Sequence, residues 1–198
     1  MRIEALVPLK DLSRGKSRLA AALAEPERVR LIRAMLERVI AAAASAPDLA
    51  RVSVLTIDPR LVPAAAYHLP DSGEELNAAL ACAALARRAA GADVLLILAA
   101  DLPFVTREEI DAVIGESRSG AVVAAPDWKD AGTNALAFPL AQALPMRFGP
   151  ASLAAHEAQA HAAGLLWRTV RRPGLAFDLD EPAQLEALAR EERYAFLR

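Results

Sequence analysis

The chain has 198 residues, 55% of them hydrophobic and 24% charged, which is typical of a globular protein, and we expect one domain spanning residues 1–198. A formal net charge of −2 argues against nucleic-acid or membrane-surface partners. The single cysteine, Cys82, excludes an internal disulfide, and we expect it to be buried. The sequence shows no signal-like or membrane-spanning segment, so we expect a cytoplasmic protein. A homodimer is left open.

Apolar runs and helical periodicities alternate along the whole chain. Apolar runs, several of them rich in β-branched residues, predict strands at residues 3–9, 52–57, 94–98, 121–125, 135–138 and 165–170. Helical spacing of apolar residues predicts helices at residues 26–46, 74–90, from 106 onward, 151–163 and 182–190. Pro26 in a first turn, a capping box at Thr106 and glycines at helix ends support these bounds. Residues 63–70 are expected to be a connecting segment. This alternation predicts an α/β fold with a mostly parallel sheet covered by helices on both faces.

The strand at residues 94–98 leads into a carboxylate, Asp101, followed closely by a proline. An apolar run without polar alternation is typical of a parallel strand buried on both faces. Ligands of open α/β sheets bind beyond the carboxyl ends of the strands, where Asp101 would lie. A carboxylate there suits Mg²⁺, which usually accompanies a phosphate substrate. The alternative is that Asp101 only opens the loop to the next helix.

A basic loop, KDLSRGKSR at residues 10–18, places four cations directly after the first strand. Its GKS segment is like the end of a P-loop, but that motif needs a glycine where this chain has Lys10. Cations beside Gly15 and a helix N-terminus at Ser17 nevertheless suit a triphosphate. The alternative is a solvated basic loop.

A second pair of carboxylates, Asp178 and Asp180, precedes the last predicted helix. Asp180 could be only an N-cap, because aspartate is favoured there. A carboxylate from a second strand end would, however, complete a metal site that Asp101 begins. The sequence leaves open whether Asp180 is a helix N-cap or a metal ligand.

Two further segments combine glycine with short polar side chains. Thr133 and Asn134 follow Gly132, and Gly149 precedes Ser152 near the start of a predicted helix. Backbone N–H groups and hydroxyls of this kind can hold a small phosphate or carboxylate. The alternative is two turns, with Ser152 serving as a helix cap.

The segment from Gly73 to Asn77 is either a helix entry or a means of bringing Asn77 to a base or ribose. His68, His156 and His161 are too scattered to form a metal set, and we expect them to be structural.

In this order, six segments between Val7 and Leu185 resemble the CofC family of guanylyltransferases of coenzyme F420 biosynthesis: VPLKDLSRGKSRLA, GEELNAAL, ILAADLP, GTNAL, RFGPASLAAH and DLDEPAQL. The resemblance implies a nucleotide-diphospho-sugar transferase-like fold, similar to that of the molybdenum cofactor guanylyltransferase. It also implies GTP, Mg²⁺ and a small phosphorylated acid: 2-phospho-L-lactate, phosphoenolpyruvate or 3-phospho-D-glycerate. The chain departs from many members in carrying less glycine over residues 73–77.

The resemblance also implies roles for individual residues in a transfer that needs no protein nucleophile. The metal would be held by Asp101 and Asp180, with Asp178 as a further ligand or support. Catalysis would rest on Lys16, Arg18 and Asp101. The nucleotide would contact Lys10, Lys16, Arg18, Gly73 and Asn77, and the acceptor would contact Thr133, Asn134, Gly149 and Ser152.

Two alternatives remain at this stage. One is a related transferase for another nucleotide or another acceptor, such as a molybdopterin or a sugar phosphate, although the usual Gly-rich entry loop is reduced here to Gly15. The other is a nucleotide-binding protein without catalysis, against which the joint presence of Asp101, Asp180, Lys16 and Arg18 argues.

Overall fold

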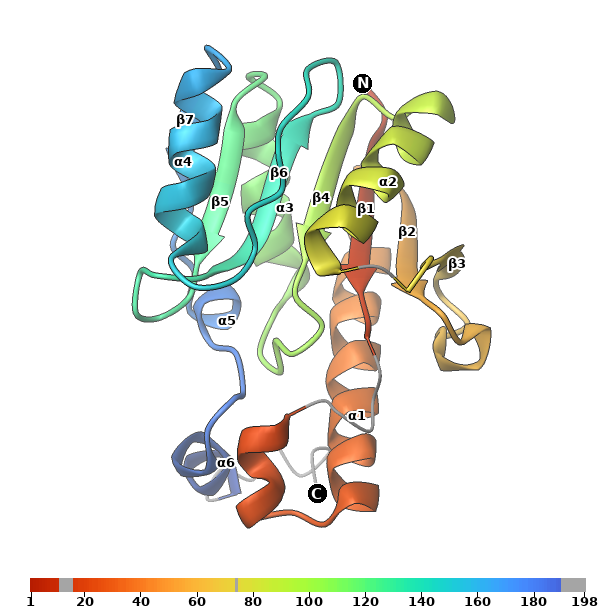
Figure 1. Ribbon diagram of the computed structural model, residues 1–198, viewed down its shortest axis with the longest axis vertical. Helices are drawn as coiled ribbons and strands as arrows, with labels where there is room; N and C mark the ends of the chain where they lie inside the picture. The colour runs from red at the N-terminus through yellow and green to blue at the C-terminus, as the bar shows by residue number, and fades with distance from the viewer. Residues whose placement is uncertain (11–15, 74, 190–198) are drawn as a thin grey trace.

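The computed structural model describes residues 1–10, 16–73 and 75–189 (Figure 1). Within them no helix is both long and apolar enough to cross a membrane. Strands, helices and short 3-10 helices (η) follow one another as β1 (Ile3–Pro8), η1 (Ser17–Ala21), α1 (Glu25–Ala44), β2 (Leu49–Thr56), η2 (Pro59–Leu61), β3 (Tyr67–Pro70), α2 (Leu76–Ala89), β4 (Val94–Leu98), α3 (Arg107–Ser117), β5 (Val122–Pro126), β6 (Thr133–Pro139), α4 (Ser152–Ala162), β7 (Trp167–Thr169), α5 (Pro173–Ala176) and α6 (Pro182–Ala189).

The described strands form one seven-stranded sheet in the order β3-β2-β1-β4-β6-β5-β7. The sheet is mostly parallel, as predicted, but β6 runs antiparallel to both of its neighbours, β4 and β5. Because of this reversal, the first residues of β6 lie beside the last residues of β4. The backbone N–H of Ala99 donates to the carbonyl of Asn134 at 2.8 Å across this junction.

Helices cover both faces of the sheet, as predicted (Figure 1). Helices α1 and α3 pack with one set of buried strand residues, while α2 and α4 pack with the other. The central strand β4 is buried throughout, so its apolar run contributes to both cores. Because β1 and β4 pair in parallel, their carboxyl ends lie side by side at the same edge of the sheet.

Three short elements and the exposure of one side chain, that of Cys82, differ from what the sequence predicted. The predicted connecting segment at 63–70 contains β3, an edge strand paired with β2, whose exposed residues give little apolar signal. The one-turn helices η2 and α5 are too short to show helical periodicity. Cys82 is exposed and not buried as expected, because α2 buries the stripe Ala79, Leu80, Ala83 and Ala84.

Candidate active site

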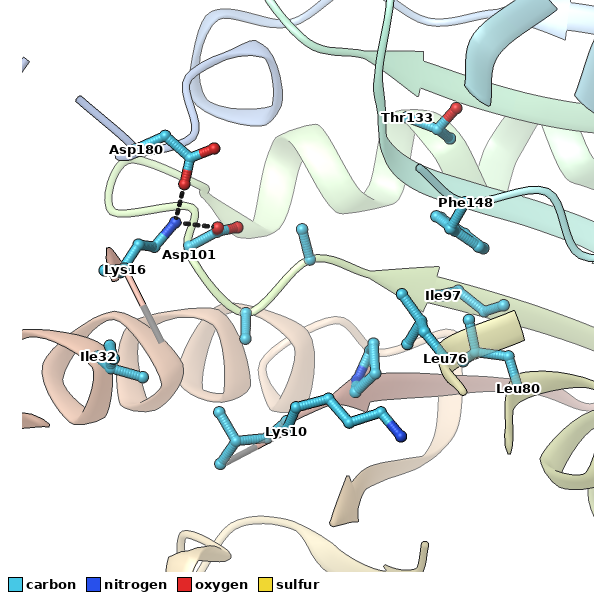
Figure 2. A pocket seen from close by; sticks show the side chains of 14 residues that line it. Lys10, Lys16, Ile32, Leu76, Leu80, Ile97, Asp101, Thr133, Phe148 and Asp180 are labelled. Atoms are coloured by element: carbon cyan, nitrogen blue, oxygen red, sulfur yellow. Dashed lines mark hydrogen bonds and ion pairs between the residues drawn. The ribbon is translucent and has the colours of Figure 1, made fainter. Parts of the chain in front are cut away.

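A pocket of about 340 Å³ lies where the ends of β1 and β4 meet the start of β6 (Figure 2). This is the edge at which ligands of open α/β sheets bind. Its polar lining comes from Lys10, Lys16, Asp101, Thr133 and Asp180, and its apolar lining includes Ile32, Leu76, Leu80, Ile97 and Phe148.

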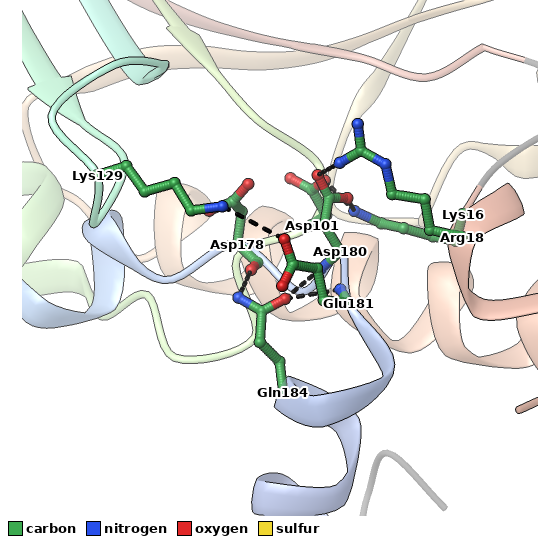
Figure 3. A network of polar contacts seen from close by, with 8 residues as sticks. All are labelled: Lys16, Arg18, Asp101, Lys129, Asp178, Asp180, Glu181 and Gln184. Atoms are coloured by element: carbon green, nitrogen blue, oxygen red, sulfur yellow. Dashed lines mark hydrogen bonds and ion pairs between the residues drawn. The ribbon is translucent and has the colours of Figure 1, made fainter.

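The charged centre of the pocket is Lys16, whose ammonium lies between two carboxylates (Figures 2 and 3). Lys16 Nζ donates to Oδ2 of Asp101 and, at 2.5 Å, to Oδ1 of Asp180. The Lys16 side chain is only 8% exposed. Burial by itself lowers the pKa of Lys16, but Asp101 and Asp180 together outweigh it and raise that pKa above its usual value. The ammonium therefore stays charged inside the pocket.

Lys16 also has an unusual backbone conformation, with φ 54° and ψ 41°. This left-handed region costs a non-glycine residue about 1–2 kcal/mol. Such conformations cluster at functional sites, where the surrounding structure holds them in place. The turn at Lys16 leads directly into η1, whose Leu19 N–H donates to the Lys16 carbonyl at 2.9 Å.

The segment that carries Asp178 and Asp180 is anchored to the loop after β4. Leu179 is fully buried, and its N–H donates to the carbonyl of Asp101 at 3.2 Å. Gln184 of α6 holds the segment from the other side, because its Oε1 accepts from the Asp180 N–H and its Nε2 donates to the Asp178 carbonyl, both at 2.8 Å (Figure 3). Gln184 was not singled out from the sequence, where it looks like an ordinary helix residue.

Asp178 is close to the charged centre but plays a different part in it. Burial, followed by the charges of Asp101 and then Asp180, raises the pKa of Asp178, while a hydrogen bond with the Asn134 side chain opposes that rise. In the described part of the chain, no three acidic, histidine or cysteine side chains are arranged to hold a metal ion. Asp101 and Asp180 are the two carboxylates that converge on Lys16, and Asp178 lies close enough for their charges to raise its pKa.

The residues expected to hold the acceptor divide between the pocket and its support. Thr133 lines the pocket, and Gly149 is exposed in the loop beside it, with φ +129°. Ser152 is 1% exposed, and its hydroxyl donates to Thr133 Oγ1 at 3.1 Å. The expectation that Ser152 contacts the acceptor directly does not fit this position, because α4 packs Ser152 behind Thr133. Asn134 is likewise buried and donates to the Leu175 carbonyl at 2.9 Å, which fixes the segment before Asp178.

The residues expected at the nucleotide also differ in their surroundings. Both polar groups of the Asn77 side chain bind the backbone of Phe148, at 2.8 and 3.0 Å. Asn77 therefore fixes the backbone of Phe148 in the apolar wall of the pocket. Lys10 pairs with the buried carboxylate of Asp71 at 2.8 Å, and the same carboxylate accepts from the N–H of Gly73 at 2.9 Å. Arg18 is 72% exposed and lies 3.8 Å from Asp180.

The fold has solved counterparts. A protein assigned as a nucleotide-diphospho-sugar transferase from Desulfovibrio desulfuricans G20 matches with a TM-score of 0.79 and 16% identity, over 100% of this chain and 95% of that one. CMP:2-keto-3-deoxy-manno-octonic acid synthetase, solved with CTP, matches with a TM-score of 0.62 and 15% identity, over 95% of this chain and 97% of that one. The fold is therefore that of the nucleotide-diphospho-sugar transferases and cytidylyltransferases.

Sequence comparison identifies the family. The profile described as guanylyl transferase CofC like matches residues 3–189, so the chain belongs to this family, as its motifs predicted. Phosphoenolpyruvate guanylyltransferase of Sphaerobacter thermophilus is 42% identical over 189 residues, 93% of this chain and 91% of that protein. The enzyme of the same name from Chloroflexus aggregans is 40% identical over 197 residues, 96% and 98% of the two chains. A 3-phospho-D-glycerate guanylyltransferase of Phenylobacterium zucineum is 36% identical over 196 residues, 94% and 89% of the two. The chain is thus a nucleotidyltransferase enzyme.

Proposed function

We propose that this chain transfers GMP from GTP to the phosphate of a small phosphorylated three-carbon acid and releases pyrophosphate, as a step of coenzyme F420 biosynthesis. The observation that carries the proposal is the pocket itself. Its charged centre, Lys16 with Asp101 and Asp180, lies in one cavity with the hydroxyl-bearing Thr133. The relatives named for phosphoenolpyruvate and 3-phospho-D-glycerate support an acceptor of this size.

The reaction is an in-line displacement at the α-phosphorus of GTP. An oxygen of the acceptor's phosphate forms the new bond to that phosphorus, and the bond between the α-phosphorus and the β-bridging oxygen breaks. Pyrophosphate leaves with that electron pair, and the product is a guanosine diphosphate ester of the acid. Such a transfer depends on alignment and on charge neutralisation.

The charged centre fits Mg²⁺. Asp101 and Asp180 already direct carboxylate oxygens at one cation, the ammonium of Lys16. Mg²⁺ in nucleotide sites commonly binds one or two carboxylates together with substrate phosphates, so this pair is sufficient on the protein side. Asp101 and Asp180 would hold the ion and Asp178 would support them. When bound, Mg²⁺ would neutralise phosphate charge and so favour the displacement.

The cations of the site would act on the triphosphate. Lys16 carries a charge that can shift from the two carboxylates to phosphate oxygens when the nucleotide enters. Arg18 is exposed beside Asp180 and can reach the same phosphates. Lys10 lines the pocket while pairing with Asp71, and we expect its ammonium to contact the nucleotide.

The proposal is tested by measuring pyrophosphate release with GTP, ATP, CTP and UTP in turn. Each nucleotide is paired with phosphoenolpyruvate, 3-phospho-D-glycerate, 2-phospho-L-lactate and glucose 1-phosphate. We expect release with GTP and one of the three-carbon acids. Release only with glucose 1-phosphate, or with another nucleotide in preference to GTP, would overturn the proposal.

A further inference from the structure

Two buried side chains of α4 hold the Thr133 hydroxyl from behind. The Ser152 hydroxyl donates to Thr133 Oγ1 at 3.1 Å, and Nδ1 of His156 lies 3.2 Å from the same oxygen. His156 is fully buried. Thr133 itself lines the pocket (Figure 2). The three residues therefore form a polar chain that runs from the interior to the cavity.

The backbone determines which nitrogen of His156 carries the proton. The N–H of Arg147 donates to His156 Nε2 at 3.0 Å. A backbone amide can only donate, so Nε2 must be unprotonated. Burial lowers the pKa of His156 to about 4, so the ring is neutral near neutral pH and its single proton lies on Nδ1. Nδ1–H therefore donates to Thr133 Oγ1.

The ring is also held in this orientation by packing. His156 meets the ring of Phe148 edge-on, with centroids 4.7 Å apart and an interplanar angle of 67°. Phe148 is a wall of the pocket and is tied through its backbone to Asn77. A flip of the imidazole would break the hydrogen bonds at both of its nitrogens. The Nδ1–H donor is thus set by the loop of Arg147 and Phe148, which lines the pocket.

A consequence follows for the direction in which the Thr133 hydroxyl acts. A hydroxyl oxygen has two acceptor positions and one proton to donate. Donors from Ser152 and His156 fill both acceptor positions. Among the described residues, none accepts a hydrogen bond from Thr133, so its proton can turn toward a group in the pocket. We propose that His156 is a positioning residue that fixes the Thr133 hydroxyl as a hydrogen-bond donor to an anionic oxygen, phosphate or carboxylate, of the acceptor acid.

This inference deepens the proposed function and rests on it for the identity of the ligand. Thr133 would then select ligand groups that accept a hydrogen bond. An acceptor oxygen can bind the Thr133 proton, whereas a group that can only donate finds both lone pairs of Thr133 Oγ1 already occupied by Ser152 and His156. The inference also explains why Ser152 belongs to the site although it is buried behind Thr133.

The tautomer is tested first, without any substrate. Long-range ¹H–¹⁵N NMR on the full chain near pH 7 reports which ring nitrogen of a histidine is protonated. The spectrum of His156→Asn assigns the His156 signals. We expect Nδ1 protonated and Nε2 unprotonated. A proton on Nε2, or on both nitrogens, would overturn the inference whatever the enzyme's substrates prove to be.

The kinetic test uses two substitutions that each keep one half of the imidazole. Asn places an N–H near the position of Nδ1, and Gln places an acceptor near that of Nε2. His156→Gln should raise the KM of the acceptor acid about 10- to 100-fold, the size of one hydrogen bond to a charged group, with the KM of GTP unchanged. His156→Asn should raise it much less. If both variants raised the acceptor KM equally, or if the rise in KM only paralleled the drop in melting temperature, His156 would have a merely structural role.

A variant of Thr133 completes the test. Thr133→Val removes the hydroxyl but keeps the shape and should raise the acceptor KM as His156→Gln does, while Thr133→Ser should largely retain binding. If His156 acts through Thr133, the double variant Thr133→Val with His156→Gln adds no further loss. Additive losses in the double variant would contradict the inference.

Discussion

Lys16 supplies the counter-charge for two carboxylates and is the residue on which the charged centre depends. Its ammonium is buried between Asp101 and Asp180, and its backbone is left-handed. Removing one partner of a buried ion pair leaves an uncompensated charge. Loss of the Lys16 ammonium would therefore leave Asp101 and Asp180 without their counter-charge.

Lys16→Met should lower the free energy of unfolding by about 1–3 kcal/mol, less than for a fully buried pair because Asp101 and Asp180 remain partly exposed. Added Mg²⁺ should restore part of this loss, since it binds the folded state in place of the ammonium. Thermal unfolding with and without Mg²⁺ measures both effects. The matched control is Arg18→Met, which removes an exposed cation 3.8 Å from the same carboxylate and should leave stability nearly unchanged. If added Mg²⁺ left the melting temperature of Lys16→Met unchanged, this would argue against a metal at these carboxylates.

Asp101→Asn should lower turnover by about 100-fold or more while the fold persists. The amide keeps the size of the carboxylate but loses the charge that the proposed metal requires, and a single electrostatic group of this kind is worth about 10²–10³ in rate. Steady-state kinetics at saturating Mg²⁺, with circular dichroism to verify folding, measures the effect. Asp48→Asn serves as the control, because Asp48 forms a surface ion pair with Arg118. Near-normal turnover of Asp101→Asn would remove this residue from the mechanism.

His156 makes stability depend on pH in a defined window. Its pKa is lowered from 6.5 to about 4 by burial, so the unfolded chain binds more protons between these values. Stability should therefore fall as pH decreases from about 6.5 to about 4, by about 3 kcal/mol in total from this group. Urea unfolding at several pH values should show that slope, and His156→Asn should flatten it. An unchanged slope in the variant would assign the pH dependence to other groups.

The sequence predicted where some site residues lie but not which groups they contact. Asp101 and Asp180 were predicted to lie together at two strand ends. They do lie together on Lys16, but Asp180 reaches it from the segment between α5 and α6 and not from a strand end. Ser152 and Asn77 were expected to face substrate. In the structure their short polar side chains bind Thr133 and the Phe148 backbone. A linear pattern cannot distinguish these two uses of the same side chain, because the partners are distant in sequence.

At the scale of elements, the N-terminus of α3 connects the loop after β4 to the segment that carries Asp178. The predicted capping box is confirmed: Glu109 accepts from the Thr106 N–H at 3.1 Å. The same carboxylate accepts from the N–H of Gly174 in α5 at 2.7 Å. A helix cap thereby also fixes the position of α5, a few residues before the charged centre.

Gly174→Ala should be strongly destabilising. An added Cβ at Gly174 would lie 2.1 Å from Glu109 Oε2 and 2.4 Å from the carbonyl oxygen of Phe104, so backbone would have to move. We expect a loss of about 1–3 kcal/mol, the usual cost of overpacking, together with reduced turnover. The control is Gly115→Ala on α3, where a Cβ meets nothing within 4 Å and helix propensity favours alanine. Chemical denaturation of the two variants provides the comparison, and equal stabilities would refute the packing argument.

The elements that the sequence predicted are those with a long periodic pattern or an unbroken apolar run. Helix α1, whose buried residues include Leu31, Met35 and Val39, follows from helical spacing, and the fully buried β4 follows from its continuous apolar run. Strand β3 and helix α5 did not follow, because four residues at an edge or in a single turn carry no period. These short elements are defined by their tertiary contacts, as in the pairing of β3 with β2.

At the scale of the whole molecule, the site depends on the reversed strand β6. If β6 were parallel to β4, its first residues would lie at the opposite edge of the sheet, far from Asp101. The antiparallel pairing from Leu98 with Ala135 to Val94 with Pro139 brings Thr133 to the pocket. The alternating pattern of strands and helices predicted a mostly parallel sheet but could not reveal this reversal, since strand direction is set by connections and not by composition.

The most direct test of the proposed function is to follow the α-phosphate of GTP into the product. The full chain is incubated with Mg²⁺, GTP labelled at the α-phosphorus and each three-carbon phosphorylated acid, and the products are separated and identified by mass. The account predicts that the label appears in a guanosine diphosphate ester of one acid, in amounts equal to the pyrophosphate released, and that Asp101→Asn almost abolishes this product. Label found only in GMP or GDP, or only in a sugar-phosphate or pterin adduct, would contradict it.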